Sequence, residues 1–202
     1  YSARVTRRER DLIKISELRI INNVPEEVQQ RLEEFVANYP DDKEGFYLLG
    51  SYSRGRENYQ AAVDAMTKAI ELDPFFKMAY NDLAYSFDEL GNSEKSIWAI
   101  NKYISLAPGE ANPYDTRGDL YAKHGKLSEA ADSYRHALAI KPDFYESLEK
   151  LGQISAYLKE YATADSCFES LTLSGNRNWR YYGEVDLIYL ARNQGRFNAS
   201  LS

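Results

Sequence analysis

Cysteine and histidine are scarce in this chain of 202 residues, which holds one cysteine, Cys167, and two histidines, His124 and His136. A single cysteine cannot form a disulfide within the chain and fits a reducing compartment, so we expect a cytoplasmic protein. Neither histidine is followed four positions later by a metal-ligating residue. We therefore expect no metal centre and no bound cofactor.

Catalytic motifs and long apolar runs are also missing. The chain has no glycine-rich phosphate loop, no GxSxG and no HExxH, so we expect no enzyme activity from these residues. No apolar run approaches the ~20 residues that a membrane span needs, and no signal peptide is visible. The net charge of −6 disfavours a nucleic-acid partner. The first residue is tyrosine rather than methionine, which indicates a segment of a longer protein.

Proline is rare but regularly spaced. Four of the six prolines, Pro40, Pro74, Pro108 and Pro142, lie 34 residues apart. A fixed period of this size is typical of a solenoid, in which each unit buries its apolar face against its neighbours. The unit at residues 111–144 predicts two short helices joined at Gly125, and two helices with so short a turn must lie antiparallel.

Small residues recur at two positions of this unit. The eighth residues are Ser16, Gly50, Ala84, Gly118 and Gly152, and four of the five twentieth residues are also small. Small side chains at both positions allow the two helices of a unit to approach closely. The twenty-fourth residues are larger, and we expect them to fill the space between units: Leu32, Met66, Ile100, Tyr134 and Phe168.

Period, small residues, turn glycines and closing prolines together resemble the tetratricopeptide repeat (TPR), a helix–turn–helix unit of 34 residues. The resemblance implies an all-α, right-handed α-solenoid. It divides the chain into a degenerate repeat at 9–42 and repeats at 43–76, 77–110, 111–144 and 145–178. Residues 179–202 then form a C-terminal capping helix and a partial repeat.

The N-terminal residues 1–8 are basic. Arg4, Arg7 and Arg8 lie there, and Arg10 follows. They form either a solvated helix start, or a linker to an upstream domain, or a functional basic arm, and we favour the first two interpretations over the third.

In tetratricopeptide arrays the first helix of each repeat lines a concave groove. The resemblance therefore assigns partner binding to residues on the first helices, which are Tyr47, Ser51, Asn81, Asp82, Tyr85, Asp88, Asn112, Asp115, Asp119, Glu149 and Tyr157. Acids outnumber bases among the groove positions, which favours a basic partner segment. A solvated, charged helix face explains the same residues equally well, and both interpretations stay open.

Family members that hold the acidic EEVD tails of chaperones use a clamp of lysine, arginine and asparagine side chains. The corresponding positions here hold Tyr47, Ser51, Asp82, Asn112 and Thr116, so every required cation is missing. The resemblance therefore implies a protein–protein interaction scaffold that is not a carboxylate-clamp co-chaperone. The repeats look like those attached to bacterial signalling proteins such as kinases and cyclases. The alternative is a structural module that builds a homo-oligomer and leaves the groove idle.

Overall fold

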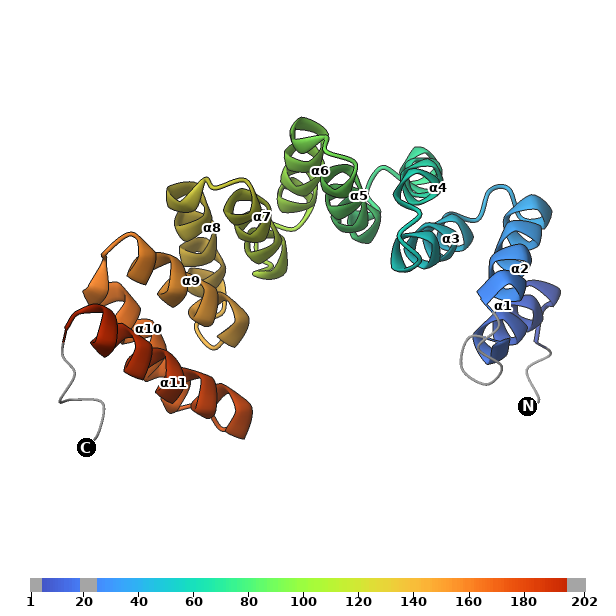
Figure 1. Cartoon of the computed structure of the whole chain (residues 1–202). Helices are drawn as coiled ribbons and strands as arrows, with labels where there is room; N and C mark the ends of the chain where they lie inside the picture. The colour runs from blue at the N-terminus through green and yellow to red at the C-terminus, as the bar shows by residue number, and fades with distance from the viewer. Residues whose placement is uncertain (1–4, 19–24, 196–202) are drawn as a thin grey trace. The chain divides into compact units, whose positions relative to one another are not determined.

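The computed structural model describes residues 5–18 and 25–195, and Figure 1 shows the path of the chain. Three sequence features discussed above fall outside these ranges: Arg4 of the basic N-terminus, Tyr1 to Ala3, and the end of the chain after Gly195. The described residues form helices and contain no strand. The helices are α1 (Arg7–Glu17), α2 (Pro25–Asn38), α3 (Lys43–Gly55), α4 (Tyr59–Leu72), α5 (Lys77–Glu89), α6 (Ser93–Leu106), α7 (Asn112–Lys123), α8 (Leu127–Ile140), α9 (Tyr145–Tyr157), α10 (Tyr161–Thr172) and α11 (Arg177–Asn193).

The chain divides into two compact units, with the boundary between Leu106 and Ala107. Unit 1 contains α1 to α6 and unit 2 contains α7 to α11. In each unit, helices pack as successive hairpins, such as α3 with α4 and α9 with α10. Within a unit, the second helix of a hairpin also contacts the next helix along the chain, as α4 contacts α5 and α8 contacts α9. This arrangement is an all-α solenoid of helical hairpins. The sequence pattern did not predict the division into two units.

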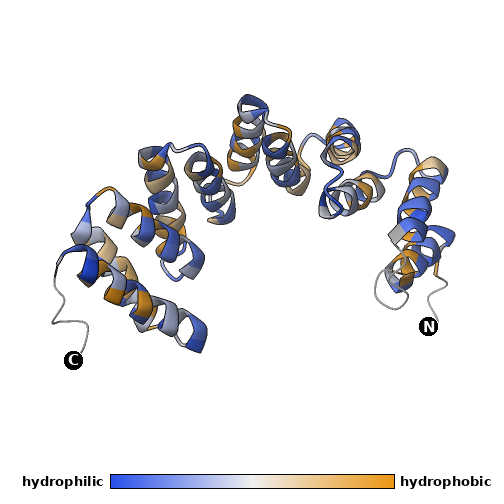
Figure 2. Ribbon diagram, viewed as in Figure 1, coloured by the Kyte–Doolittle hydropathy of each residue, from blue (hydrophilic) through white to orange (hydrophobic). Residues whose placement is uncertain are grey.

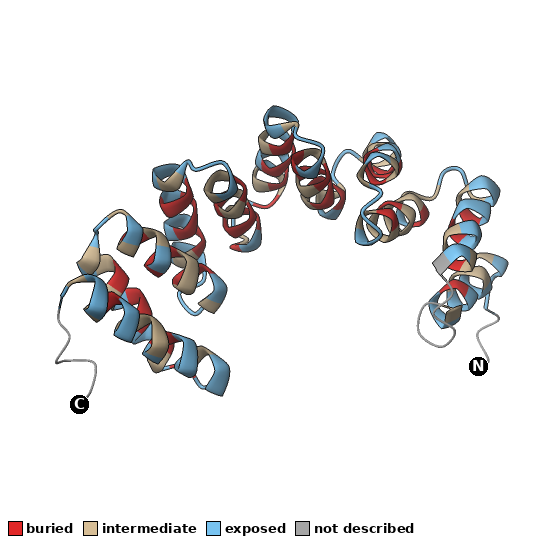
Figure 3. Ribbon diagram, in the orientation of Figure 1, coloured by how far each residue is buried: buried red, intermediate tan, exposed pale blue. Residues whose placement is uncertain are grey.

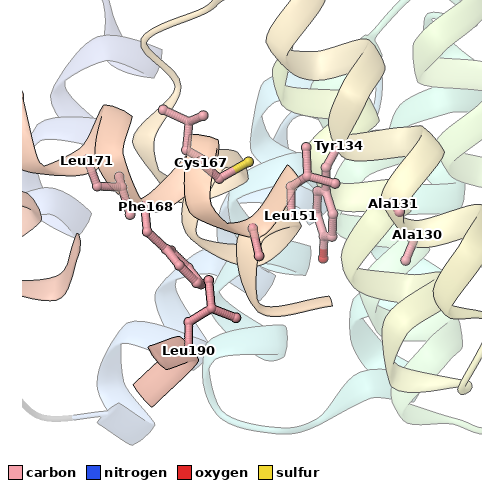
Figure 4. Packing of buried hydrophobic residues seen from close by; sticks show 10 residues of the cluster. Ala130, Ala131, Tyr134, Leu151, Cys167, Phe168, Leu171 and Leu190 are labelled. Atoms are coloured by element: carbon pink, nitrogen blue, oxygen red, sulfur yellow. The ribbon is translucent and has the colours of Figure 1, made fainter. Parts of the chain in front are cut away.

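Apolar positions lie on the sides of each helix that face its neighbours (Figure 2), and the buried residues of α5 and α6 lie between those two helices (Figure 3). In unit 2 the buried side chains form a continuous cluster that runs from α8 through α9 and α10 to α11. Tyr134, Leu151, Phe168 and Leu190 belong to it (Figure 4). Within unit 2, each hairpin therefore completes its core against the helices that follow it, as expected of a repeat protein.

Glycine at the eighth position of a repeat makes room for the side chain sixteen residues later. A Cβ atom on Gly118 would lie 2.4 Å from the Tyr134 ring, and one on Gly152 would lie 2.4 Å from the Phe168 ring. A Cβ atom on Gly50 would lie 2.9 Å from the Met66 side chain. Each of the three large residues therefore packs over the glycine of its own hairpin, and Tyr134 and Phe168 also belong to the cluster that joins successive hairpins of unit 2.

The turn between the two helices of a repeat needs a left-handed residue. Gly91 and Gly125 supply it with φ of +75° and +71°, and Gly195 after α11 has φ of +73°. Glu57 and Lys159 occupy the same place in their repeats with φ of 60° and 64°. This conformation costs more free energy for a residue with a side chain than for glycine. Because Glu57 and Lys159 adopt it all the same, the packing of the two helices imposes this backbone geometry whether or not the residue is glycine.

The basic N-terminus enters a helix. Thr6 caps α1 and forms a capping box with Glu9, so Arg7 and Arg8 lie inside α1. The Arg8 guanidinium pairs with the Asp42 carboxylate and lies 2.7 Å from Glu44 Oε2. Within the described residues, Arg8 is therefore a structural link between α1 and the start of α3 and not part of a free arm.

Asp42 offers a test of this link because its carboxylate has two roles: it pairs with Arg8 and it caps α3 by accepting from the Gly45 amide at 3.1 Å. Burial raises the pKa of Asp42, but the bonds from Arg8 and Gly45 outweigh it and hold that pKa below its usual value. We expect Asp42→Asn, which keeps the cap, to weaken the docking of α1 by about 0.5–1 kcal/mol. Asp42→Ala should lose about 1 kcal/mol more.

Hydrogen exchange measures this effect. In Asp42→Asn, amides in the middle of α1 should exchange faster while those of α3 keep their protection. Since the pKa of Asp42 is lowered in the folded state, its contribution exists at neutral pH and disappears as the pH falls through that pKa. Wild-type α1 should therefore lose protection in acid, whereas Asp42→Asn should show little of this pH dependence. Equal exchange of α1 in both proteins at neutral pH would contradict the link.

Candidate partner-binding faces

The eleven predicted partner-binding residues lie on the first helix of each hairpin. Unit 1 carries Tyr47 and Ser51 on α3, and Asn81, Asp82, Tyr85 and Asp88 on α5. Unit 2 carries Asn112, Asp115 and Asp119 on α7, and Glu149 and Tyr157 on α9. We call the side of α3 and α5 that bears these residues face 1, and the corresponding side of α7 and α9, continued by α11, face 2.

Face 1 is organised around a buried carboxylate. Asp82 is only 6% exposed, and its Oδ1 atom lies 3.5 Å from Arg54 Nε. The Arg54 guanidinium also lies over the Tyr85 ring, 6.0 Å from its centroid. Burial raises the pKa of Asp82, while the Arg54 charge and hydrogen bonds from Ser51, Asn81 and Tyr47 oppose the rise. Asp82 therefore joins α3 to α5 inside unit 1 and offers little negative charge to solvent.

Face 2 holds a second internal charge cluster, in which one lysine joins two aspartates. Lys150 Nζ on α9 lies 2.9 Å from Asp115 Oδ2 and 2.7 Å from Asp119 Oδ1, both on α7. Ser147 donates to Asp115 at 2.7 Å, and the Tyr134 hydroxyl donates to Asp119 at 2.8 Å. Asp115 is 7% exposed. These two acids therefore hold α7 against α9, and Lys150 neutralises much of their charge.

The end of face 2 is different. Glu149 on α9 and Asp186 on α11 form no ion pair with any cation in residues 5–18 and 25–195. Asp186 lines a cavity of about 350 Å³ between α9, α10 and α11, which we call the α9–α11 pocket. Tyr157 and Tyr189 border it and are 77% and 58% exposed. This pocket combines the Asp186 carboxylate with exposed aromatic rings. Glu149 lies beside it on α9, where Gln153 of the pocket lining donates to its carboxylate at 3.5 Å.

Comparison with known proteins agrees with the hairpin geometry. Two family models, both described as tetratricopeptide repeat, match this chain: one at residues 29–75 and 47–111, the other at 111–144. The chain belongs to the tetratricopeptide repeat family. The matched residues include face 1 and the α7 part of face 2, so the prediction of an all-α tetratricopeptide solenoid is confirmed.

Relatives of this tetratricopeptide chain are larger proteins. Mouse tetratricopeptide repeat protein 16 is 27% identical over 166 residues, and the alignment covers 73% of this chain but only 22% of the mouse protein. Among solved structures, MamA from Desulfovibrio magneticus, residues 41 to the end, has a TM-score of 0.69 at 20% identity and covers 82% of this chain and 94% of the other. At that identity the likeness concerns the fold alone.

A second similar structure has a ligand. The first TPR of Spaghetti, solved with the HSP90 peptide SRMEEVD, has a TM-score of 0.54 at 23% identity and covers 58% of this chain and 93% of the other. In this chain the clamp positions include Asp82, which already pairs with Arg54 inside face 1. That this tetratricopeptide chain does not bind acidic chaperone tails stays a prediction.

The sequence analysis did not predict that α11 contributes residues to face 2. Tyr182, Asp186, Tyr189 and Asn193 recur at i, i+4, i+7 and i+11, which places them on one side of a helix. This spacing could have been found. It was overlooked because α11 was interpreted only as a cap, whose apolar residues cover the preceding hairpin. The adjacent side of α11 does pack on that hairpin, through Gly183 and Leu190.

Two further findings concern the described residues alone. None of their helices is long and apolar enough to cross a membrane. Cys167 lies in the unit 2 core, where burial raises the pKa of its thiol to about 11. Little of this thiol is ionised at neutral pH, so it is a poor nucleophile.

Proposed function

We propose that this chain is a protein–protein interaction module that binds a segment of a partner protein along the first-helix faces of its repeats. Tetratricopeptide proteins are scaffolds of this kind, and the Spaghetti domain described above was solved with a peptide bound. The observation that carries the proposal for this chain is the exposure of Tyr157, 77%, on face 2 beside a cavity. Exposed tyrosines at a concave site are frequent energetic centres of protein interfaces.

The proposal assigns no catalytic role to these residues. It places the chain in the cytoplasm, for which the single, buried Cys167 is the support. Because the chain spans 22% of mouse tetratricopeptide repeat protein 16, the module is proposed to serve a larger protein. A bacterial signalling protein as the parent stays a prediction.

The first test compares tyrosines on the faces with an apolar residue on a second helix. Tyr85→Ser and Tyr157→Ser change face 1 and face 2, and Ile140→Ser changes an exposed position at the end of α8. Partner proteins retained by the immobilised wild-type chain are identified, and their affinity is then measured for each variant. We expect a face substitution to weaken binding about tenfold or more, as is usual for an interface tyrosine, and Ile140→Ser to leave it unchanged.

Sedimentation of the purified chain addresses the structural alternative. A monomer that binds a partner through Tyr85 or Tyr157 supports the proposal. A stable homo-oligomer whose assembly depends on the same tyrosines, with no other protein bound, would contradict it and favour the oligomerisation module.

A further inference from the structure

Three acids on the two faces already have a cation within the same unit. Asp82 pairs with Arg54 on face 1, and Asp115 and Asp119 share Lys150 on face 2. An incoming basic segment would have to displace these internal partners to reach the carboxylates. Glu149 and Asp186, at the end of face 2, have no such ion pair among the described residues and can therefore offer negative charge to a partner.

Asp186 is arranged unusually for a surface acid. Its Oδ2 atom is buried and has no hydrogen-bond partner, while Gln153 donates to the carboxylate. Burial raises the pKa of Asp186, and burial followed by the Asp186 charge raises the pKa of Glu149. A buried carboxylate oxygen without a donor costs free energy. The wall of the α9–α11 pocket therefore holds a carboxylate whose negative charge is poorly stabilised by the protein itself and would attract a cation in the pocket.

The rest of the pocket fits a long, flat cation. Phe168 and Leu190 contribute apolar surface, which can cover the methylene groups of a long side chain. Tyr157 and Tyr189 offer aromatic faces at the border, and a guanidinium stacks on such rings. A guanidinium also donates two parallel hydrogen bonds to one carboxylate, which an ammonium cannot do. A cavity of about 350 Å³ has room for one such side chain.

We propose that the α9–α11 pocket binds an arginine side chain of the partner segment. Asp186 in the pocket lining and Glu149 beside the pocket are its counter-charges, and Tyr157 and Tyr189 stack on it. This inference rests on the proposed function and names the chemistry that one site on face 2 recognises. It replaces a broad acidic groove with a single acidic pocket at one end of the chain.

The probe is N-acetyl-arginine methylamide, titrated into the ¹⁵N-labelled 202-residue chain and followed by NMR. We expect saturable shifts that centre on the Gln153 side-chain amide and the backbone amides of Tyr157 and Asp186. The citrulline analogue has the same shape without the charge and should bind at least about fivefold more weakly, as loss of an ion pair predicts. The lysine analogue should fall between them. Equal binding of arginine and citrulline, or shifts spread over both units without saturation, would overturn the inference.

Two isosteric variants and a matched control sharpen the test. Asp186→Asn and Glu149→Gln should each weaken arginine binding about fivefold or more, whereas Glu169→Gln, at an exposed position on α10, should not. Asp186→Asn should also melt no lower than wild type, because it removes a buried charge that has no cation. An Asp186→Asn variant that binds normally, or that unfolds, would mean that the carboxylate serves the fold and would contradict a binding role.

A chain truncated after Gly195 tests whether the pocket binds a partner segment or residues 196–202 of the same chain. We expect it to bind the arginine probe as the full chain does. A tenfold or greater gain in affinity for the probe on truncation would show that the chain's own end fills the pocket, which would overturn the partner assignment.

The proposed function has a separate readout. Loss of partner binding in Tyr85→Ser or Tyr157→Ser would uphold it even if the arginine probe failed to bind.

Discussion

Replacing Gly183 with leucine is expected to detach α11 from α10 and to destabilise unit 2 by about 3 kcal/mol or more, at the upper end of overpacking effects. A Cβ atom on Gly183 would lie 2.7 Å from the Phe168 carbonyl oxygen and 2.9 Å from the Thr172 amide nitrogen. Both are backbone atoms of α10, so no side-chain rotation can relieve the collision. The helices must separate, which would expose Leu171 and Leu190 of the unit 2 core.

The matched control for this substitution is Glu184→Leu, which adds a leucine at the next position on an exposed side of α11. The two tryptophans report on different units, since Trp98 lies on α6 and Trp179 on α11. Chemical denaturation is followed by Trp179 fluorescence in a Trp98→Phe background. The free energy of unfolding of unit 2 should fall for Gly183→Leu and not for Glu184→Leu. A Gly183→Leu protein as stable as its control would mean that α11 does not pack closely on α10.

The second large effect is expected for Lys150→Met. Removal of this cation leaves Asp115, which is 7% exposed, and Asp119 next to each other without a counter-charge. Loss of one partner from a buried ion pair typically costs about 3–5 kcal/mol, and we expect roughly 2–3 kcal/mol here because the Lys150 side chain is partly exposed. Chemical denaturation at neutral pH measures this loss, which should fall on unit 2.

Acid should diminish the effect of Lys150→Met. Burial raises the pKa of Asp119, and the hydrogen bond from Lys150 counters that rise. Without Lys150 the pKa rises further, so the folded variant gains a proton as the pH falls towards the ordinary aspartate pKa of 3.8. A raised folded-state pKa favours folding below the unfolded-state pKa and loses that contribution as the pH rises through the folded-state value. The gap between variant and wild type should therefore shrink in acid.

Two controls accompany this prediction. Lys102→Met removes a lysine from an exposed position on α6 in unit 1 and should change stability little. Lys150→Met combined with Asp115→Asn removes one of the orphaned charges and should recover part of the loss at neutral pH. If the single and combined variants are equally unstable, Lys150 acts through packing and not through its charge.

The repeat architecture could be predicted because its causes are local and periodic. Gly118 and Gly152 are small where a ring lies over the helix, and Gly91 and Gly125 take the left-handed conformation that the turn requires. The same logic fails where the hairpin imposes geometry on another residue. Lys159 adopts a positive φ although its side chain disfavours it, because helices on both sides fix the turn.

The chemistry of the faces was harder to predict, because it depends on contacts between helices about thirty residues apart in the sequence. The sequence shows that Asp82, Asp115 and Asp119 lie on first helices. It does not show that Arg54 and Lys150 reach them from the neighbouring helix and neutralise them. The burial of Asp186 likewise depends on how α11 packs against α9 and α10, and no spacing within α11 reveals it.

Site-specific photocrosslinking tests most directly whether these repeats bind a partner through their first helices. A photoreactive benzoylphenylalanine replaces Tyr85 or Tyr157 on the faces, or Glu169 on α10 and Ile140 on α8 as second-helix controls. After irradiation with the partner bound, mass spectrometry identifies the crosslinked peptides. We expect adducts from Tyr85 and Tyr157, with the Tyr157 adduct on a partner segment that contains arginine, and none from the controls. Adducts that arise from positions 140 and 169, or that join only copies of this chain, would contradict partner binding by the first-helix faces.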